Sequence, residues 1–533
     1  MLAEGRNEEV WGKYCGFLDL NLEQFMQIQK RLLQEQMQLL SNCELGQQLL
    51  GGQTPKSIAE FRQIAPLTTY KDYLDYLPTK REDALPAKPK VWMRTSGRTG
   101  EFSGKWVPCS EEFYAQISSF LVGAAILASA RFKGDIRLSE QDTFLYTVAP
   151  PPYFSGIAIH AAGDGEFPFQ YVPSIAEAET MSFQERLEEG FSQSLETGIG
   201  YFMGVASVLL RIGESFAGDS ERSMSIRTLL RPKILFRLGR GFLNSKLQKR
   251  DILPRDIWTP KGIVASGTDV QVYKQRIKTL WGIMPLEAYG CTEFGGVAWQ
   301  SWGARSKGLT MSPDSAFWEF IPEDEYNTWK LNLDYKPKTL VFDQLTPGRY
   351  VLVGTSFNGG AFIRYILGDL ISVISLNDEN AGIQLPQIVV ESRVDDVIDM
   401  VGMVILTERA VWRAIGEMGL PNMDWILRKE YNNEINEPFL SFYVEDMDRT
   451  PEDLATDLHN VFISCIDDYS TYYDFMQKNP IKVTMLSPGT FIAYFKQMEA
   501  EHADPGHFKP PRMQSSDEVM ARLTHISAEI AES

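Results

Sequence analysis

A loop rich in glycine and hydroxyl side chains lies in the first fifth of the chain, and its composition suits phosphate binding. Thr95, Ser96, Gly97, Arg98, Thr99 and Gly100 are consecutive, and Gly104 and Lys105 follow shortly after. Such a loop can turn its N–H groups inward as a nest for phosphate oxygens, and a lysine adds positive charge. The spacing of a Walker loop is absent. An ordinary surface turn explains the composition about equally well, so the loop alone identifies no function.

A second candidate is the run Tyr289-Gly290-Cys291-Thr292-Glu293, which follows an apolar segment. At the point where a strand passes into a loop, the carboxylate of Glu293 could bind Mg²⁺. The neighbouring hydroxyl of Thr292 could then meet a phosphate oxygen. The alternative is that Glu293 is a solvated loop acid, which is the default for a single carboxylate of this kind.

Two further segments carry aspartates at suggestive places. Asp369 ends the run Arg364-Tyr365-Ile366-Leu367-Gly368-Asp369, and Asp395 belongs to Arg393-Val394-Asp395-Asp396. An ionised aspartate can accept hydrogen bonds from both hydroxyls of a ribose, although an aspartate after glycine commonly just makes a turn. The run around Asp395 reads as a charged linker, which is compatible with a hinge.

Composition limits the classes of partner. The chain has 533 residues and a formal net charge of -18, which argues against a nucleic acid as the main partner. Its five cysteines and five histidines are scattered, so neither a zinc site nor a disulfide framework is indicated. The apolar run 120–130 is shorter than the ~20 residues of a membrane span, and the N-terminus lacks an apolar signal core. We therefore expect a cytoplasmic protein without a membrane partner.

Short apolar runs, which are typical of strands, alternate along the chain with longer amphipathic runs, which are typical of helices. This alternation favours an α/β fold, whose strands and helices would position the four segments. Helices are expected over 20–50, 111–130, 270–280, 408–418 and 451–466, residues 183–210 contain helical patterning, and the last ~15 residues are expected to form a polar helix or tail. Strands are expected over 143–148, 262–266, 349–354, 361–365, 370–374 and 440–444. Residues 340–375 suggest a local antiparallel piece, and 487–513 a loop.

The pattern of apolar and amphipathic runs changes after Asp395, and this change predicts two domains. The large N-terminal domain (1–394) would have mixed sheets with flanking helices, and the smaller α+β C-terminal domain (395–533) would cap it.

The order of the four segments resembles the adenylate-forming superfamily of acyl-CoA ligases, luciferases and adenylation domains. That superfamily has a Thr/Ser/Gly loop, a Tyr-Gly-x-Thr-Glu segment, a Tyr-x-x-Gly-Asp segment and an Arg-x-Asp hinge in this order, and the likeness spans about residues 58–513. A narrower likeness is to the Gretchen Hagen three family of auxin-responsive acyl-acid amido synthetases. It rests on Glu60-Phe61-Arg62 with the run 66–73, Pro488-Gly489-Thr490-Phe491, and Phe508-Lys509-Pro510-Pro511-Arg512.

The resemblance implies roles at the matching positions. It assigns Thr95, Ser96, Gly97, Arg98, Thr99 and Gly100 to the phosphates, Gly267, Thr268, Tyr289 and Gly290 to the adenine region, Thr292 to the α-phosphate, Glu293 to Mg²⁺, Asp369 to the ribose, Arg393 to the nucleotide, Asp395 to the hinge and Lys509 to catalysis. Arg98 stands where the family usually has Thr or Ser, and Phe508 replaces the usual Tyr. The loop is also about one residue longer before Lys105, which leaves the role of that lysine open.

The implied reaction is ATP-dependent adenylation of a carboxylic acid, followed by acyl transfer to an amine, which the family implies is an amino acid. An acyl-CoA ligase that forms a thioester is the first alternative, and a non-catalytic nucleotide-binding module is the second. Phe154, His160, Phe202, Phe294, Trp299 and Trp302 are candidates for the acyl pocket, although aromatics of this kind are more often core residues. Neither substrate's identity nor the oligomeric state follows from the sequence.

Overall fold

The protein is described by a computed structural model, in which contacts divide the chain into two compact units, Met1–Val390 and Glu391–Ser533. The predicted domain boundary lies between residues 394 and 395. That the second unit moves as a cap stays a prediction. The structure describes residues 4–95, 105–165, 167, 169–218, 231–267, 270–304, 306–332, 334–394, 397–400, 404–420, 423–432, 437–445, 449–466, 469–476, 478–500 and 512–532.

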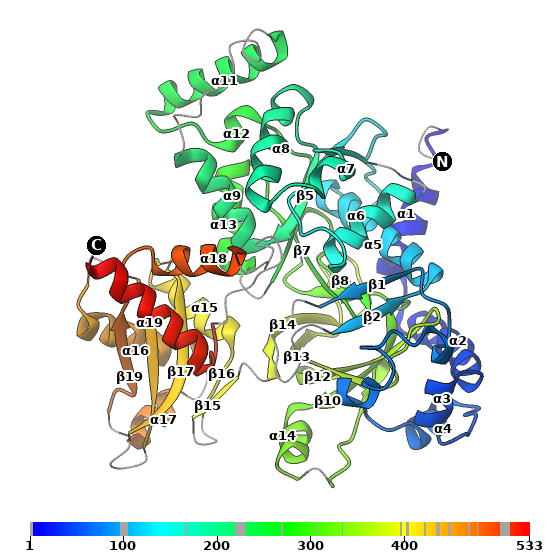
Figure 1. The fold of residues 1–533 in the computed structure, drawn as a ribbon. Coiled ribbons are helices and arrows are strands. Elements are labelled where there is room, and N and C mark those ends of the chain that lie inside the picture. Colours follow the sequence, from blue (N-terminus) through cyan, green and yellow to red (C-terminus); the bar gives the residue numbers. More distant parts are fainter. Residues whose placement is uncertain are drawn as a thin grey trace. The chain divides into compact units, whose positions relative to one another are not determined.

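The first unit is built on one twelve-stranded mixed sheet (Figure 1). Its parallel half contains, from the edge inward, β4 (Gln170–Val172), β3 (Thr143–Leu145), β5 (Tyr201–Val205), β6 (Gly262–Ser266) and β7 (Leu286–Cys291). The sheet continues through β8 (Gly295–Trp299), β9 (Leu309–Met311), β14 (Gln387–Arg393), β13 (Tyr365–Ser375), β12 (Gly348–Ser356), β10 (Ala316–Pro322) and β11 (Leu340–Val341). A separate hairpin pairs β1 (Val91–Arg94) with β2 (Trp106–Cys109).

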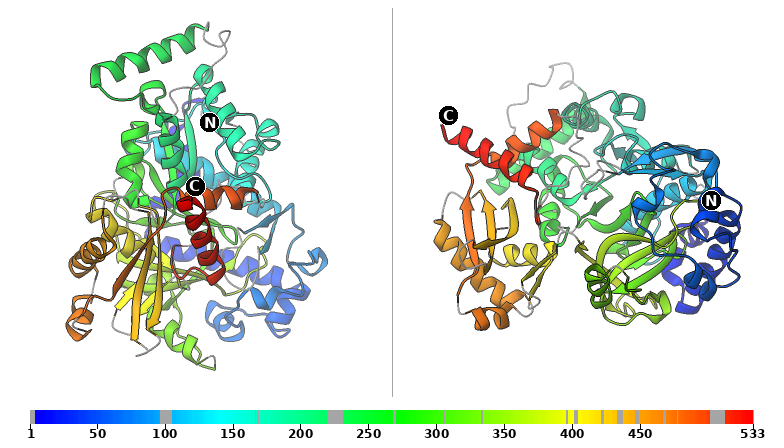
Figure 2. Two further views of the ribbon diagram at one scale, coloured as in Figure 1. Left: turned by 60° about the vertical axis from the view of Figure 1, so that its left-hand side comes forward. Right: turned by 60° about the horizontal axis from the view of Figure 1, so that its bottom comes forward.

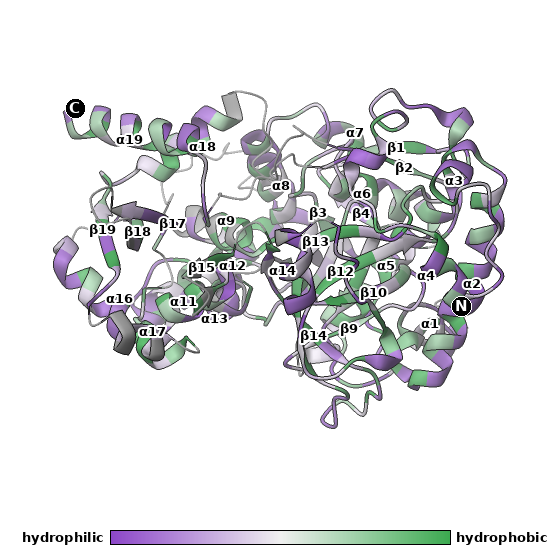
Figure 3. Cartoon of the chain, turned by 90° about the horizontal axis from the view of Figure 1, so that it is seen from below, coloured by the Kyte–Doolittle hydropathy of each residue, from purple (hydrophilic) through white to green (hydrophobic). Residues whose placement is uncertain are grey.

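Helices surround this sheet. They are α1 (Asn7–Cys15), α2 (Leu22–Ser41), α3 (Glu44–Leu49), α4 (Ile58–Ile64), α5 (Glu111–Ser129), α6 (Phe154–Asp164), α7 (Ile175–Ala178), α8 (Phe183–Thr197), α9 (Ala206–Gly218), α11 (Pro232–Gln248), α12 (Pro254–Ile257), α13 (Val270–Trp281) and α14 (Glu323–Leu331). Several have amphipathic patterns: α2 carries both purple, hydrophilic and green, hydrophobic residues in Figure 3. It buries Phe25, Leu33 and Leu40 on one face.

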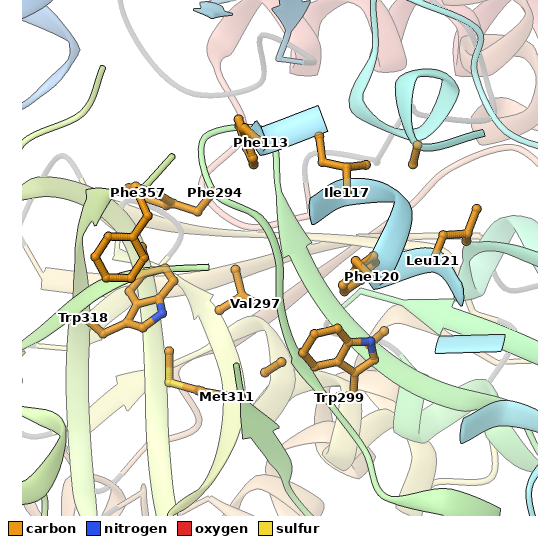
Figure 4. Close-up of a cluster of buried hydrophobic side chains, with 14 of the residues drawn as sticks. Phe113, Ile117, Phe120, Leu121, Phe294, Val297, Trp299, Met311, Trp318 and Phe357 are labelled. Atoms are coloured by element: carbon orange, nitrogen blue, oxygen red, sulfur yellow. The ribbon is translucent and has the colours of Figure 1, made fainter. Parts of the chain in front are cut away.

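Helix α5 packs against the middle of the sheet and forms much of the core (Figure 4). Phe120 lies against Trp299 of β8, with ring centroids 4.8 Å apart. Among the described residues, α5 is a helix long and apolar enough to cross a membrane by length and composition. However, 67% of its apolar window is buried inside the protein, which is typical of a core helix.

The second unit is a small α+β structure (Figure 2). A three-stranded sheet joins β17 (Trp425–Asn432), β18 (Glu437–Val444) and β19 (Ile481–Met485), and β15 (Ile398–Met400) pairs with β16 (Val404–Leu406). Its helices are α15 (Glu408–Glu417), α16 (Pro451–Cys465), α17 (Tyr469–Met476), α18 (Thr490–Ala500) and α19 (Asp517–Glu532). The predicted α/β class, with a large N-terminal and a smaller α+β C-terminal part, is confirmed.

Most element predictions are confirmed, and two are wrong. The helical patterning within 183–210 is confirmed as α8 and the start of α9, with β5 between them, because Gly198, with φ of 91°, ends α8. Residues 361–364 precede β13 rather than forming a strand. The predicted loop over 487–513 contains α18. The N-terminal backbone of that helix donates to the carboxylate of Glu445, from Gly489 N at 2.9 Å and Phe491 N at 2.6 Å, and a local sequence pattern does not reveal so distant a cap.

A buried ion cluster joins α4, β10 and the start of β13. Glu319 on β10 has no exposed surface, and its carboxylate accepts from Nε and Nη2 of Arg364 at 2.8 and 2.9 Å. The Nε of Arg62 donates to the same carboxylate at 2.9 Å. Arg364 also donates from Nη1 to the backbone oxygens of Arg62 and Ala65, so one guanidinium connects β10 and the end of α4 to the start of β13.

We predict that Glu319→Gln lowers the free energy of unfolding by about 3–5 kcal/mol, because it leaves the buried Arg364 and the partly buried Arg62 without their counter-charge. Urea denaturation checks this. Glu35→Gln is the matched control, since Glu35 forms an exposed pair with Arg31 on α2, and its loss should stay below ~0.5 kcal/mol. A loss below about 1 kcal/mol for Glu319→Gln would contradict this role for the cluster.

Candidate functional site

The Tyr-Gly-x-Thr-Glu segment forms the tip of the β7–β8 hairpin. Cys291 pairs with Gly295, so residues 292–294 make the turn. A Cβ on Gly296 would lie 1.4 Å from the Phe120 ring, so the core allows only glycine there. The hairpin begins where β7 leaves the parallel half of the sheet. Ligands of α/β sheets commonly bind beyond the carboxyl ends of such strands.

Gly267 lies directly after β6, the parallel neighbour of β7. The register pairs Ala265 with Glu287, so Gly267 and Tyr289 are level with each other on adjacent strands. Gly267 has φ of 122°, which is a conformation suited to glycine. Thr268 lies outside the described residues.

Asp369, on β13, lies next to Tyr289 at the end of β7. Its strand pairs with β12 through an irregularity between Val351 and Val353, and Gly368 has φ of 80°. Bulges of this kind re-aim side chains near functional sites. The hydroxyl of Tyr289 donates a hydrogen bond to the Asp369 carboxylate. The structure therefore brings together two of the predicted motifs, which are 80 residues apart in the chain.

The base of the Thr/Ser/Gly loop is described, and its tip is not. Thr95 N donates to Lys105 O, and Lys105 N donates to Thr95 Oγ1, each at 2.9 Å. Ser96, Gly97, Arg98, Thr99 and Gly100 lie outside the described residues. The Nζ of Lys105 donates to the Tyr365 hydroxyl at 3.1 Å, so the loop's base is tied to the first residue of β13.

Two tyrosines that sequence reasoning did not assign complete this region. Tyr70 receives a hydrogen bond from Trp106 N at 2.8 Å, and Lys105 Nζ lies 5.5 Å from the Tyr70 ring centroid and 5.8 Å from that of Tyr365. Cation–π attraction therefore helps to hold this ammonium group. The sequence signal for Tyr70 is the family-like run 66–73, to which it belongs, but the resemblance assigns that run no role at the site.

Negative charge dominates the hairpin tip. Burial raises the pKa of the Cys291 thiol well above its usual value, and the Glu293 and Asp369 carboxylates add to that rise. Burial also raises the pKa of Tyr70 to about 12, again with a contribution from Glu293. Glu293 and Asp369 therefore act on the same small volume, at the end of β7.

Glu293, the predicted metal ligand, fits a cation that is bound mainly by groups other than protein side chains. Among the residues that the structure describes, no group of three or more His, Cys, Asp or Glu side chains is arranged to hold a metal ion. Glu293 is 8% exposed and offers hard carboxylate oxygens at the hairpin tip. One or two carboxylates supplemented by substrate phosphates and water are typical of Mg²⁺. The residues present therefore fit a Mg²⁺ ion that arrives with a nucleotide.

The remaining predicted site residues belong to the second unit. Arg393 is the last residue of β14, whereas Asp395 and Lys509 lie outside the described residues. Arg512, three positions after Lys509, is nearly fully buried. Its guanidinium donates to Asp424 at 2.8 Å and lies 4.6 Å from the Trp412 ring centroid. The chain following Lys509 is thus anchored in the core of the second unit.

The candidate acyl-pocket residues divide into two groups. Phe202, Phe294, Trp299 and Trp302 are buried core residues, which is the alternative given for aromatics of this kind. Phe154 is half-buried at the start of α6, and its ring lies 3.6 Å from where a Cβ of Gly290 would be. His160, also half-buried, bonds to Glu179. Phe294 belongs to the hairpin turn but is buried in the core, so Phe154 is the partly exposed candidate that lies beside the hairpin tip.

A mixed α/β sheet with three converging motifs beyond a parallel strand defines the chain as an adenylate-forming fold. The model of the GH3 family N-terminal domain matches residues 16–197, and that of the GH3 family central domain matches residues 309–403. Together they cover just over half of the chain. The chain belongs to the GH3 (Gretchen Hagen three) family, as the resemblance indicated.

Solved structures of the same fold agree with this assignment. One is the AtGH3.15 acyl acid amido synthetase in complex with 2,4-DB, at 16% identity and TM-score 0.69, covering 98% of this chain and 96% of that chain. Another is a 2-hydroxyisobutyryl-CoA ligase in the postadenylation state with 2-HIB-AMP, at 15% identity and TM-score 0.59, covering 96% of this chain and 93% of that chain. At such identities the likeness concerns the fold alone. Among curated protein sequences, none matches the chain.

The raised pKa of Cys291 makes its alkylation a probe of the two carboxylates. Because the thiolate is the reactive form, iodoacetamide should modify Cys291 slowly at neutral pH and faster as the pH rises above the usual thiol range. Glu293→Gln or Asp369→Asn should each lower this pKa and speed the labelling several-fold at pH 8. Site-resolved mass spectrometry measures the rate.

Asp343→Asn, which neutralises an exposed carboxylate elsewhere in the first unit, is the control and should leave the rate unchanged. Unchanged labelling in both site variants would mean that the two carboxylates do not act on Cys291.

Proposed function

We propose that the protein is an ATP-dependent, AMP-forming acyl-acid amido synthetase. The observation that carries the proposal is the bond between Tyr289 and Asp369 in a GH3-family chain, because it joins the two motifs assigned to adenine and ribose. The match to the structure of an acyl acid amido synthetase covers nearly the whole chain, which supports the same reaction class.

The chemistry begins with a carboxylate that is too poor an electrophile to react with an amine directly. Its oxygen attacks the α-phosphorus of ATP in line, the bond to the bridging oxygen breaks, and pyrophosphate leaves. Negative charge develops on the phosphate oxygens, so N–H donors and cations around them supply most of the catalysis. The amine nitrogen then attacks the acyl carbon, loses a proton, and AMP leaves with the former carboxylate oxygen.

The residues have distinct tasks in this proposal. Thr95 at the base of the loop, together with the loop residues 96–100, binds the phosphates. Tyr289 and Gly267 line the adenine, and Asp369 accepts from the ribose hydroxyls. Thr292 donates to the α-phosphate, and Glu293 holds Mg²⁺, which when bound neutralises phosphate charge. Lys105, at the base of the loop, is placed by Tyr365 and Tyr70.

The second unit supplies the remaining groups. Lys509 stabilises charge during adenylation, Arg393 reaches the nucleotide, and rotation about Asp395 exchanges the two half-reactions. Arg512, three positions after Lys509, is held by Asp424 and Trp412 in the core of the second unit. The substrates are then a carboxylic acid and an amino acid, and the setting is the cytoplasm.

The test is pyrophosphate release with ATP and Mg²⁺ over a panel of carboxylic acids, each without acceptor, with mixed amino acids, and with CoA. Acid-dependent release that amino acids increase, with an amide found by mass spectrometry, is the expected result. Release increased by CoA alone would establish the acyl-CoA ligase instead. ATP binding without release for any acid would favour the non-catalytic nucleotide-binding module.

Asp369→Asn should weaken ATP binding by roughly 10–150-fold, since a hydrogen bond to a charged group contributes about 1.5–3 kcal/mol. Tyr289→Phe removes the hydroxyl that bonds to Asp369 and should have a smaller effect in the same direction. Isothermal titration calorimetry measures both dissociation constants. Equal affinity in wild type and Asp369→Asn would remove Asp369 from the ribose site.

Lys509→Ala should lower the rate of adenylation by at least about 100-fold while the dissociation constant for ATP changes little, because its interaction is made mainly in the transition state. Lys496→Ala, which removes an exposed lysine from α18, is the control. Single-turnover formation of the adenylate reports the rate. Equal losses in binding and rate would count against the assigned role.

A further inference from the structure

Helix α11 exposes an apolar face that the proposed reaction does not use. Among the described residues, thirteen large hydrophobic side chains are exposed, and five of them lie on this helix. They are Leu235 (53% exposed), Phe236 (72%), Phe242 (58%), Leu243 (59%) and Leu247 (73%). At 100° per residue they fall within an arc of about 140°, so they form one continuous face. A patch of this kind marks an interaction surface.

The opposite face fixes α11 to the first unit. Ile234 and Gly241 are buried, and the helix packs on α12. Arg240 donates from Nε to Asp256 O at 2.9 Å and from Nη2 to Ile257 O at 2.8 Å. Both Figure 1 and the left view of Figure 2 draw α11 at the outer edge of this unit. The apolar face is therefore held outward by packing.

The charge of the helix is opposite to that of the chain. Between Pro232 and Lys249 there is no acidic residue, although the whole protein carries a net charge of -18. Lys233, Lys246 and Lys249 are exposed along or beside the apolar face. The family matches end at residue 197 and resume at residue 309, so neither of them includes this helix.

We propose that α11 docks the protein on an anionic lipid surface, with its apolar face in the headgroup region. Phe and Leu on one face with lysines beside them are typical of interfacial helices. Lysines attract anionic lipids only within about a Debye length, ~8 Å at physiological salt, so a local cluster suffices despite the acidic remainder. This contact is peripheral and spans no membrane, but it departs from the expectation, drawn from the sequence, of a protein without a membrane partner.

Two other occupants fit less well. A symmetric contact with a second copy would bury Lys246, which lies within the apolar arc, and the partner's copy of the helix, which has no acidic residue between Pro232 and Lys249, would offer it no counter-charge. At a lipid surface its stem can lie along the apolar face while the ammonium group reaches the headgroups. The face is also the convex side of a single helix of about 25 Å, and a protein partner would need a matching groove, whereas lipid deforms around it.

The test is co-sedimentation of the full chain with vesicles of phosphatidylcholine alone and of phosphatidylcholine mixed with phosphatidylglycerol. The wild type should bind the anionic vesicles roughly tenfold more tightly or better. Phe236→Ser/Phe242→Ser should lose this binding, as should Lys233→Gln/Lys246→Gln/Lys249→Gln. Phe132→Ser, which removes an equally exposed phenylalanine outside α11 (57%), is the matched control and should bind like wild type.

Three results would overturn the proposal. They are equal binding to neutral and anionic vesicles, unchanged binding in the Phe236→Ser/Phe242→Ser variant, and binding to neither vesicle. A dimer in light scattering that this variant dissolves would assign the face to a second copy, and binding to neither vesicle with a monomer would assign it to a protein partner. Far-UV circular dichroism shows whether each variant is folded, and pyrophosphate release is independent of the outcome.

Discussion

The arrangement of the first unit depends on one buried carboxylate. Glu319 lies between Arg364 and Arg62, and Thr339 Oγ1 donates to it at 2.6 Å. A carboxylate removed from water in this way is stable only when its charge and its lone pairs are satisfied, and here four donors from three segments satisfy them. Since Arg364 has φ of 43°, the cluster also holds the chain in an unusual conformation directly before β13. The strand that carries Asp369 therefore starts from a fixed point. The segment around Thr68 strengthens it, because Thr68 N donates to Arg364 O at 3.0 Å and Ile366 N donates to Thr68 O at 2.8 Å.

The geometry of the sheet brings the site residues together, starting from this fixed beginning of β13. The bulge at Gly368 turns Asp369 toward Tyr289, and the hairpin after β7 presents Thr292 and Glu293 at the carboxyl edge of the parallel strands. Lys105 then connects the phosphate loop to Tyr365. Burial raises the pKa of the Cys291 thiol and of the Tyr70 phenol, and the acidic side chains concentrated here add to the rise. The same negative field would attract a metal cation bound to a nucleotide, so cation and phosphates enter together in the proposed reaction.

The motifs and several local elements could be predicted from the sequence, whereas the tertiary contacts around them could not. Strand β6 and helix α13 have the predicted position, because their patterns are local and their flanks carry glycine or polar residues. The pairing of Tyr289 with Asp369 did not follow from either motif, since a β-bulge and a twelve-stranded register create it. Helix α18 was missed because Glu445 caps it from a distant loop, and Tyr70 because its partners, Trp106 and Lys105, are set by tertiary packing. The exposed face of α11 was likewise invisible, since an apolar stripe in sequence normally indicates a core.

The central claim is that the acid becomes an acyl-adenylate before it meets the amine, and oxygen labelling tests this most directly. A carboxylic acid that carries ¹⁸O in both carboxyl oxygens is incubated with ATP, Mg²⁺, the protein and an amino acid, and the products are weighed by mass spectrometry. Attack on the α-phosphorus predicts AMP with one ¹⁸O and an amide that retains the other. Amide formation with unlabelled AMP, or with the label in inorganic phosphate and ADP as product, would contradict it.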